Sequence, residues 1–160
     1  KHLQLKENNS IAEYLIERTA ELNNIEPLIV EKAVALTKER ANTLAEIWPL
    51  CSYLFVRPNE YNEKNLNKIS STLTIKILEE LCAEISEITP FKESSLSESV
   101  KGWINKNAYS FGSVMQPARL AIVGELKGVD LFVIIEFIGK VEAVSRFKEL
   151  ADKIKKSNPV

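Results

Sequence analysis

Residues 62–88 read NEKNLNKISSTLTIKILEELCAEISEI, and their apolar residues recur at intervals of three and four positions. Because an α-helix turns once every 3.6 residues, this spacing collects the apolar side chains on one face. We therefore predict one long amphipathic helix over the whole stretch, with a single face buried in a core. The residues of that face are Leu66, Ile69, Leu73, Ile77, Leu78, Leu81, Ile85 and Ile88.

Helix signals extend in both directions from this stretch. Pro27 suits the first turn of a helix, because the N–H that proline lacks would be unpaired there. Residues 129–138 are apolar on nearly every face and precede Gly139, which predicts a short central helix that ends at this glycine. A last helix is expected over about 140–155. Four pairs have the capping-box spacing that begins a helix, namely Ser10 with Glu13, Thr43 with Glu46, Ser95 with Glu98, and Ser113 with Gln116.

The stretch VRPNEYN, residues 56–62, is the clearest break in this helical pattern. Pro58 disfavours helix at Arg57, and the asparagines favour turns. We therefore predict an all-α fold, a helical bundle of about seven or eight helices in two packed subdomains, residues 1–58 and 59–160. Shorter breaks are expected at 88–95, 106–112 and 124–128.

The composition favours a globular protein of a reducing compartment. The chain has 160 residues, enough for a sizeable core, and its two cysteines, Cys51 and Cys82, lie in apolar helical patterns typical of packed thiols. The longest apolar run, residues 129–139, contains Glu136 and is too short for a membrane span. The N-terminal stretch KHLQLKENNS lacks the apolar core of a signal peptide, so we expect a cytoplasmic protein without membrane contact.

The net charge of −1 hides a gradient along the chain. Residues 1–60 hold 7 Lys or Arg and 9 Asp or Glu, residues 61–100 hold 4 and 7, and residues 101–160 hold 10 and 6. The last third is therefore mildly basic and could meet phosphates over a small footprint. A random variation of surface charge explains the gradient equally well.

The residues for a self-contained active site are missing. The sole histidine, His2, is near a terminus, and no Cys, His or carboxylate cluster has metal-ligand spacing. No glycine-rich phosphate loop is present. Adjacent glutamates such as Glu79 and Glu80 are typical of the solvated face of a helix. We therefore expect no catalytic residue, metal or cofactor in this chain.

The arginines of this chain suit the recognition of a ligand better than catalysis. Arg40 closes the helix that begins near Pro27, and Arg119 lies among apolar residues in SVMQPARLAIVG, residues 113–124. A buried guanidinium needs a partner, and two arginines facing a groove could read base edges bidentately. Arg40 could equally complete a helix end or a salt bridge, and Arg119 could extend to solvent. Gln116 could simply complete its capping box.

Two aromatic residues precede Arg119 in the stretch KNAYSFG, residues 106–112. Tyr109 and Phe111 could stack on unpaired bases. Packing in the core, or a hydrophobic staple at a helix start, is the more common role for such residues.

Two longer segments together carry a family resemblance. LTKERANTLAEIWPLCSYLF, residues 36–55, and GSVMQPARLAIVGELKGVDLFVIIEFIGKVEAVSRF, residues 112–147, resemble the C-terminal anticodon-binding region of bacterial glutamyl-tRNA synthetase, a class I aminoacyl-tRNA synthetase. The second segment has QPAR where the family has QPLR, followed by an apolar run, a glycine, LF and a GK pair at the family spacing. The resemblance covers about residues 30–150 and implies an all-helical module that receives the anticodon loop of glutamate tRNA.

The resemblance also implies roles for particular residues. Arg40 is expected to read the third anticodon base and so to separate glutamate from glutamine tRNA, and Arg119 and Gln116 to lie against the anticodon. Ser110 and Phe111 stand where the family often has a basic residue, which favours Phe111 as a stacking residue. The loop expected near the anticodon consists of Gly128, Val129, Asp130 and Leu131.

The catalytic domain of that family has no counterpart in this chain. The resemblance therefore implies a non-catalytic fragment of a glutamate-tRNA ligase, whose ATP and Mg²⁺ would be bound only in the missing domain. The expected partners are glutamate tRNA and the N-terminal catalytic domain, with no DNA and with a monomeric state. Two alternatives remain at this point: a helical protein-interaction domain with no RNA role, and a small enzyme with an unrecognised site.

Overall fold

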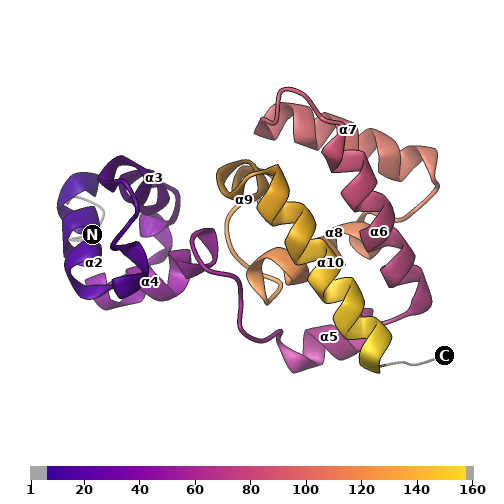
Figure 1. Cartoon of the computed structure of the whole chain (residues 1–160), viewed down its shortest axis with the longest axis horizontal. Helices are drawn as coiled ribbons and strands as arrows, with labels where there is room; N and C mark the ends of the chain where they lie inside the picture. Colours follow the sequence, from indigo (N-terminus) through magenta and orange to yellow (C-terminus); the bar gives the residue numbers. More distant parts are fainter. Residues whose placement is uncertain (1–6, 158–160) are drawn as a thin grey trace. The chain divides into compact units, whose positions relative to one another are not determined.

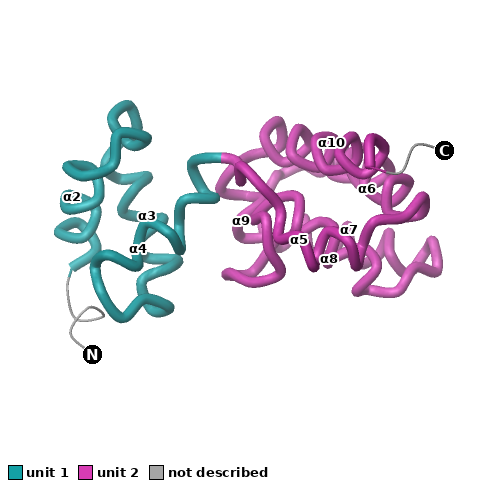
Figure 2. Tube along the Cα trace, turned by 90° about the horizontal axis from the view of Figure 1, so that it is seen from below, with its two compact units in different colours: residues 1–56 teal, residues 57–160 magenta. Residues whose placement is uncertain are grey.

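The computed structural model describes residues 7–157, and every regular element in that range is helical. It contains nine α-helices and three short 3₁₀ turns, with no strand among the described residues. The chain divides into two compact units, residues 1–56 and residues 57–160, coloured separately in Figure 2. The prediction of an all-α fold is confirmed, and the number of helices slightly exceeds the expected seven or eight.

Unit 1 is a small helical bundle in which α3 packs against both α2 and α4. Pro27 is the first residue of α3, as predicted. Its core contains Ile11, Leu15, Leu22, Val30, Val34 and Ile47, all at most 2% exposed. The elements are α2 (Asn8–Arg18), η1 (Ala20–Leu22), α3 (Pro27–Thr37), η2 (Lys38–Arg40), α4 (Leu44–Cys51) and η3 (Ser52–Leu54).

Unit 2 is built around the last helix, α10, which packs against α6 and α8 (Figure 1). The apolar stretch after residue 128 forms α9 and ends at Gly139, whose φ of 87° suits glycine, so this prediction is confirmed. The core contains Ile77, Leu78, Leu96, Leu120, Ile134 and Phe147. The elements are α5 (Glu63–Ile69), α6 (Thr72–Ser86), α7 (Glu93–Lys106), α8 (Phe111–Val123), α9 (Leu131–Ile138) and α10 (Lys140–Ser157).

The single long helix predicted over residues 62–88 is wrong. The stretch forms α5 and α6, separated at Ser70 and Ser71. The Ser70 hydroxyl donates to the Leu66 carbonyl at 2.6 Å and so completes the end of α5. The Ser71 hydroxyl accepts the N–H of Thr74 at 3.0 Å and caps α6. Serine therefore breaks the helix although the apolar spacing continues across it.

Three of the four predicted capping boxes are misplaced. Ser10 and Ser95 lie inside α2 and α7, which begin at Asn8 and Glu93. Ser113 lies inside α8, which begins two residues earlier and is capped by Ser110 through the Ser113 N–H at 3.2 Å. Thr43 does directly precede α4, but its side chain makes no capping hydrogen bond there. The predicted spacing thus identified four helices but located the start of only one of them, α4.

The terminal segments bear on two sequence-based expectations. Residues 1–6, which include His2 and most of the stretch considered for a signal peptide, lie outside the described residues, as do residues 158–160. Among the helices of residues 7–157, none is both long and apolar enough to cross a membrane.

The turn between α7 and α8 yields a stability prediction. Ala108 has a φ of 56°, and the N–H groups of Ala108 and Tyr109 donate to Asn105 and Ile104 carbonyls, which is the Schellman pattern that usually places glycine here. We expect Ala108→Gly to stabilise unit 2 by about 0.5 kcal/mol, since relief of the left-handed strain exceeds the extra entropy of unfolded glycine. Calorimetry of the chain measures the change.

The matched control for this substitution is Ala83→Gly in α6. Ala83 is exposed and helical, so glycine there should cost about 1 kcal/mol. Opposite signs for the two variants support the left-handed turn, whereas equal destabilisation would contradict it.

Candidate nucleic-acid interface

Helix α8 carries three of the sequence-predicted site residues of unit 2, Phe111, Gln116 and Arg119. Gly112, Gln116 and Arg119 recur at helical spacing on a face that remains partly open to solvent. Pro117 and Ala118 are buried on the opposite side. Pro117 is the seventh residue of α8, which begins at Phe111. The helix thus holds Gln116 and Arg119 on a rigid, half-exposed face.

Arg119 has partners within the chain, as expected from the sequence for an arginine among apolar residues. Its Nη1 donates to the Val129 carbonyl at 2.8 Å and to the Lys127 carbonyl at 3.4 Å. Both carbonyls belong to the loop between α8 and α9. The guanidinium therefore ties α8 to the loop that the family resemblance places near the anticodon.

The loop itself, residues 124–130, has two glycines with positive φ. Gly124 ends α8 at φ 91°, and Gly128 has φ 122°. The Asp130 carboxylate caps α9 by accepting the N–H groups of Phe132 at 2.9 Å and Val133 at 3.3 Å. Of the four loop residues predicted to meet RNA, Val129 and Leu131 have buried side chains, Gly128 is half-buried and Asp130 is exposed.

The two candidate stacking residues differ in their surroundings. The Tyr109 hydroxyl donates to Glu80 at 2.9 Å, and its ring meets Trp103 edge-on at 5.6 Å between centroids. The hydrogen bond to Glu80 raises the pKa of the Tyr109 hydroxyl. Phe111 is 53% exposed at the start of α8. The geometry therefore favours packing for Tyr109 and leaves Phe111 as the better stacking candidate.

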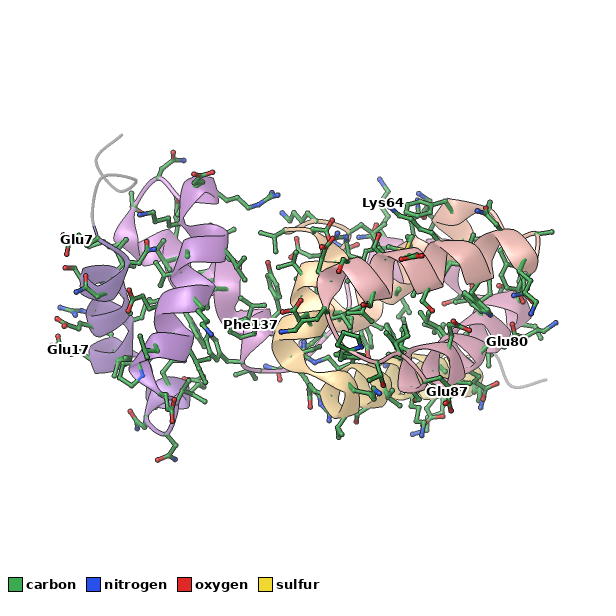
Figure 3. The ribbon with its side chains drawn as sticks, turned by 90° about the horizontal axis from the view of Figure 1, so that it is seen from above. Glu7, Glu17, Lys64, Glu80, Glu87 and Phe137 are labelled. Carbon is green, nitrogen blue, oxygen red and sulfur yellow. The ribbon has the colours of Figure 1, made fainter. Side chains whose placement is uncertain are left out.

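The segment that leads into and forms α8 has no acidic residue. Residues 99–124 contain Lys101, Lys106 and Arg119 and neither Asp nor Glu. Both lysines are exposed. Elsewhere, acidic and basic side chains are mixed on the outer helix faces, as Figure 3 shows for Glu17 on α2 and Lys64 on α5. The segment therefore contributes only positive charge of its own, which suits contact with a phosphate backbone, and the nearby carboxylates of Glu80 and Glu84 are engaged by its Tyr109 and Ser99 hydroxyls.

Arg40, the candidate reader in unit 1, lies in the turn η2 at the end of α3. Its side chain is exposed, while the neighbouring Ala41 is buried and fixes the turn against the unit 1 core. The Thr37 hydroxyl donates to the Ala33 carbonyl at 2.8 Å in the turn before it. The roles inferred from the sequence for Arg40 and for the site residues of unit 2 stay predictions.

A charged network behind α8 was missed from the sequence. Arg146 is only 2% exposed and pairs with Glu142 at 2.8 Å, and Arg57 pairs with the same carboxylate at 2.8 Å. Burial alone would raise the pKa of Glu142, but hydrogen bonds from both arginines hold this pKa below its usual value. The sequence feature that could have indicated this network is Arg146, which falls on the buried face of α10 between the core residues Ala143 and Phe147.

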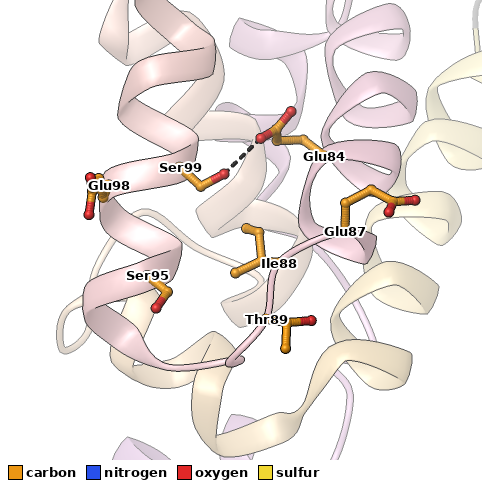
Figure 4. A pocket seen from close by; sticks show the side chains of 7 residues that line it. All are labelled: Glu84, Glu87, Ile88, Thr89, Ser95, Glu98 and Ser99. Atoms are coloured by element: carbon orange, nitrogen blue, oxygen red, sulfur yellow. Dashed lines mark hydrogen bonds between the residues drawn. The ribbon is translucent and has the colours of Figure 1, made fainter.

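One pocket of unit 2 has the wrong charge for RNA. A cavity of about 460 Å³ opens between the end of α6 and α7 (Figure 4). Glu84, Glu87 and Glu98 line it, and the Ser99 hydroxyl donates to Glu84 at 2.7 Å. Among the described residues, no group of three or more His, Cys, Asp or Glu is placed to hold a metal ion. The acidic lining would repel phosphates, so this pocket is not a candidate for binding RNA.

Comparison with known proteins agrees with the helical arrangement. Residues 10–151 match the family model described as an anticodon binding domain. The glutamate–tRNA ligase of Christiangramia forsetii is 34% identical over 156 residues, which cover 96% of this chain and 31% of that protein. The glutamate–tRNA ligase of Flavobacterium johnsoniae is 40% identical over 121 residues, covering 76% of this chain and 24% of that protein.

A solved structure shows the same similarity in three dimensions. The crystal structure of a glutamate tRNA ligase from Elizabethkingia meningosepticum, in complex with its amino acid, superposes with a TM-score of 0.85 at 34% identity. The match covers 96% of this chain and 31% of that one. This chain therefore spans about a third of the length of the ligases that it matches.

Proposed function

The chain belongs to the anticodon-binding domain family, and we propose that it binds the anticodon loop of glutamate tRNA as the RNA-recognising part of a glutamate–tRNA ligase. The observation that carries the proposal is the match over residues 10–151, which includes helices of both units and the whole of α8 and the loop 124–130. No observation favours the alternative of a protein-interaction domain without an RNA role.

The geometry of α8 supports a division of roles in RNA binding. Lys101 and Lys106 would meet phosphates, since both are exposed and segment 99–124 has no Asp or Glu of its own. Unpaired bases would stack on the exposed ring of Phe111 and meet Gln116 and Arg119 with their polar edges. Phe111, Gln116 and Arg119 are all on α8, so they would act on adjacent nucleotides, while Lys101 and Lys106 are on α7.

The proposed ligase reaction would take place outside this chain. The matched ligases are about three times longer, and we place ATP, Mg²⁺ and glutamate in the N-terminal catalytic domain of such a parent protein. The chain would then contribute specificity, acting as a monomer in the cytoplasm, where it would hold the tRNA while the catalytic domain attaches the amino acid.

RNA binding by the chain should depend on salt. We expect the anticodon stem-loop of glutamate tRNA to bind roughly 20-fold more weakly at 200 mM than at 50 mM salt, if about three cations meet phosphates of a single-stranded loop. Titration of the labelled stem-loop with the 160-residue chain at the two salt concentrations measures the ratio. A stem-loop that fails to bind at 50 mM salt would exclude the proposed function and favour a protein partner.

A further inference from the structure

The C-terminal end of α8 is held by a side chain from α10. The Nη1 of Arg146 donates to the Ile122 carbonyl at 2.7 Å. Ile122 lies in the last turn of α8, where carbonyls have no partner within the helix. A buried guanidinium therefore completes the end of the helix that carries Gln116 and Arg119.

The same end of α8 is also held by the first residues of unit 2. The Asn62 N–H donates to the Gly124 carbonyl at 2.8 Å. A side chain at Gly124 would collide with Pro58, because a Cβ built there lies 2.8 Å from the Pro58 Cβ. Segment 57–62 therefore packs directly on the residue where α8 ends and the loop 124–130 begins.

Glu142 joins these two supports. Its Oε2 accepts from the Nε of Arg146 at 2.8 Å and from the Nε of Arg57 at 2.8 Å, and its Oε1 accepts from the Nη2 of Arg57 at 3.1 Å. Arg57 also pairs with Glu149 at 3.1 Å. One carboxylate thus orients both the arginine that completes α8 and the arginine that fixes segment 57–62 to α10.

We propose that Glu142 is a positioning residue for RNA binding, which sets the direction of α8 and of the loop 124–130 through Arg146 and Arg57. This inference rests on the proposed function. Buried ion pairs are weak sources of net stability, whereas their hydrogen bonds have strict geometry, so orientation is the property that this network is suited to supply. The loop begins at Gly124, and a small rotation there would move the carbonyls that Arg119 binds.

The test compares Glu142→Gln with Lys155→Met in the 160-residue chain. Lys155 pairs with Glu79 at 2.8 Å and ties the other end of α10 to α6, so it is a matched loss of an ion pair away from α8. We expect Glu142→Gln to weaken binding of the anticodon stem-loop about 5- to 20-fold, because glutamine loses the bond to the Arg57 Nη2 and makes its remaining bonds to Arg57 and Arg146 without a negative charge, and to speed amide exchange at residues 124–131. Lys155→Met should change the affinity for the stem-loop and the exchange rates at residues 124–131 by less than about twofold.

A milder pair of variants covers the case in which Glu142→Gln unfolds. Arg57 is 41% exposed, so Arg57→Met leaves the Arg146 pair and the core in place, and Arg57→Lys restores a cation near Glu142 and Glu149. We expect Arg57→Met to weaken RNA binding and Arg57→Lys to recover part of it. If the unmodified chain binds RNA and Arg57→Met or Glu142→Gln binds equally well, the positioning role is wrong. If the unmodified chain binds no RNA, the proposed function fails together with this role.

Discussion

Replacing Arg119 with methionine is expected to weaken binding of the glutamate tRNA stem-loop about 10- to 100-fold. Hydrogen bonds from a charged donor contribute about 1.5–3 kcal/mol, and Arg119 donates to the Val129 and Lys127 carbonyls. Methionine fills similar space but makes neither bond. The loop 124–130 would then lose its tie to α8, and the RNA would lose a cation from the proposed interface.

Arg119→Lys separates these two effects. Lysine keeps the charge and has three donors, but its flexible ammonium group has no planar fork to fix the direction of its hydrogen bonds, so it would hold the loop less firmly. If Arg119 acts mainly by holding the loop, Arg119→Lys should bind weakly while its salt dependence matches that of the unmodified chain. If it acts mainly as a cation, lysine should restore most of the affinity.

The control is the same substitution at an arginine of α2. Arg18 lies over the Tyr14 ring at 4.0 Å and is exposed, and no sequence or structural feature places it in the interface. Arg18→Met should therefore change RNA affinity by less than about twofold, measured by the same titration. Equal losses for Arg18→Met and Arg119→Met would show that only total charge matters, and would remove Arg119 from the site.

The fold class was predictable from the sequence because its signals are local. Apolar spacing, Pro27 at the start of α3 and Gly139 at the end of α9 each act within one or two helical turns. The break at Ser70 and Ser71 was not predictable from spacing, because the apolar period continues across it. There the serine hydroxyls compete with the backbone for hydrogen bonds, and a helix end replaces a helix interior.

The site was predictable only in part. The family resemblance named both Arg119 and the loop 128–131, and the structure brings them into contact. The resemblance could not show that the Arg119 guanidinium binds carbonyls of this loop, because that contact depends on the path of the loop through Gly124 and Gly128, which both have positive φ. The difference between Tyr109 and Phe111 likewise depends on a distant residue, Glu80, which is 29 positions away along the chain.

Arg40→Gln is expected to reduce the preference for glutamate over glutamine tRNA. An unpaired cytosine presents acceptors to an arginine, whereas a guanine presents donors on the same edge. A mismatch of this kind costs about 1–3 kcal/mol, a factor of roughly 5 to 150 in affinity. Arg40 is exposed at the end of η2, where a rigid turn against the unit 1 core can hold its guanidinium toward a base.

Two stem-loops that differ only in the third anticodon base, cytosine or guanine, measure this preference directly. The unmodified chain should favour cytosine by that factor, and Arg40→Gln should bring the ratio close to one, because glutamine both donates and accepts. Lys32→Gln removes a charge from an exposed position of α3, so it should lower both affinities alike or not at all. If Arg40→Gln keeps the same ratio of affinities for the cytosine and guanine stem-loops, another residue reads the base. Loss of charge alone cannot distinguish cytosine from guanine.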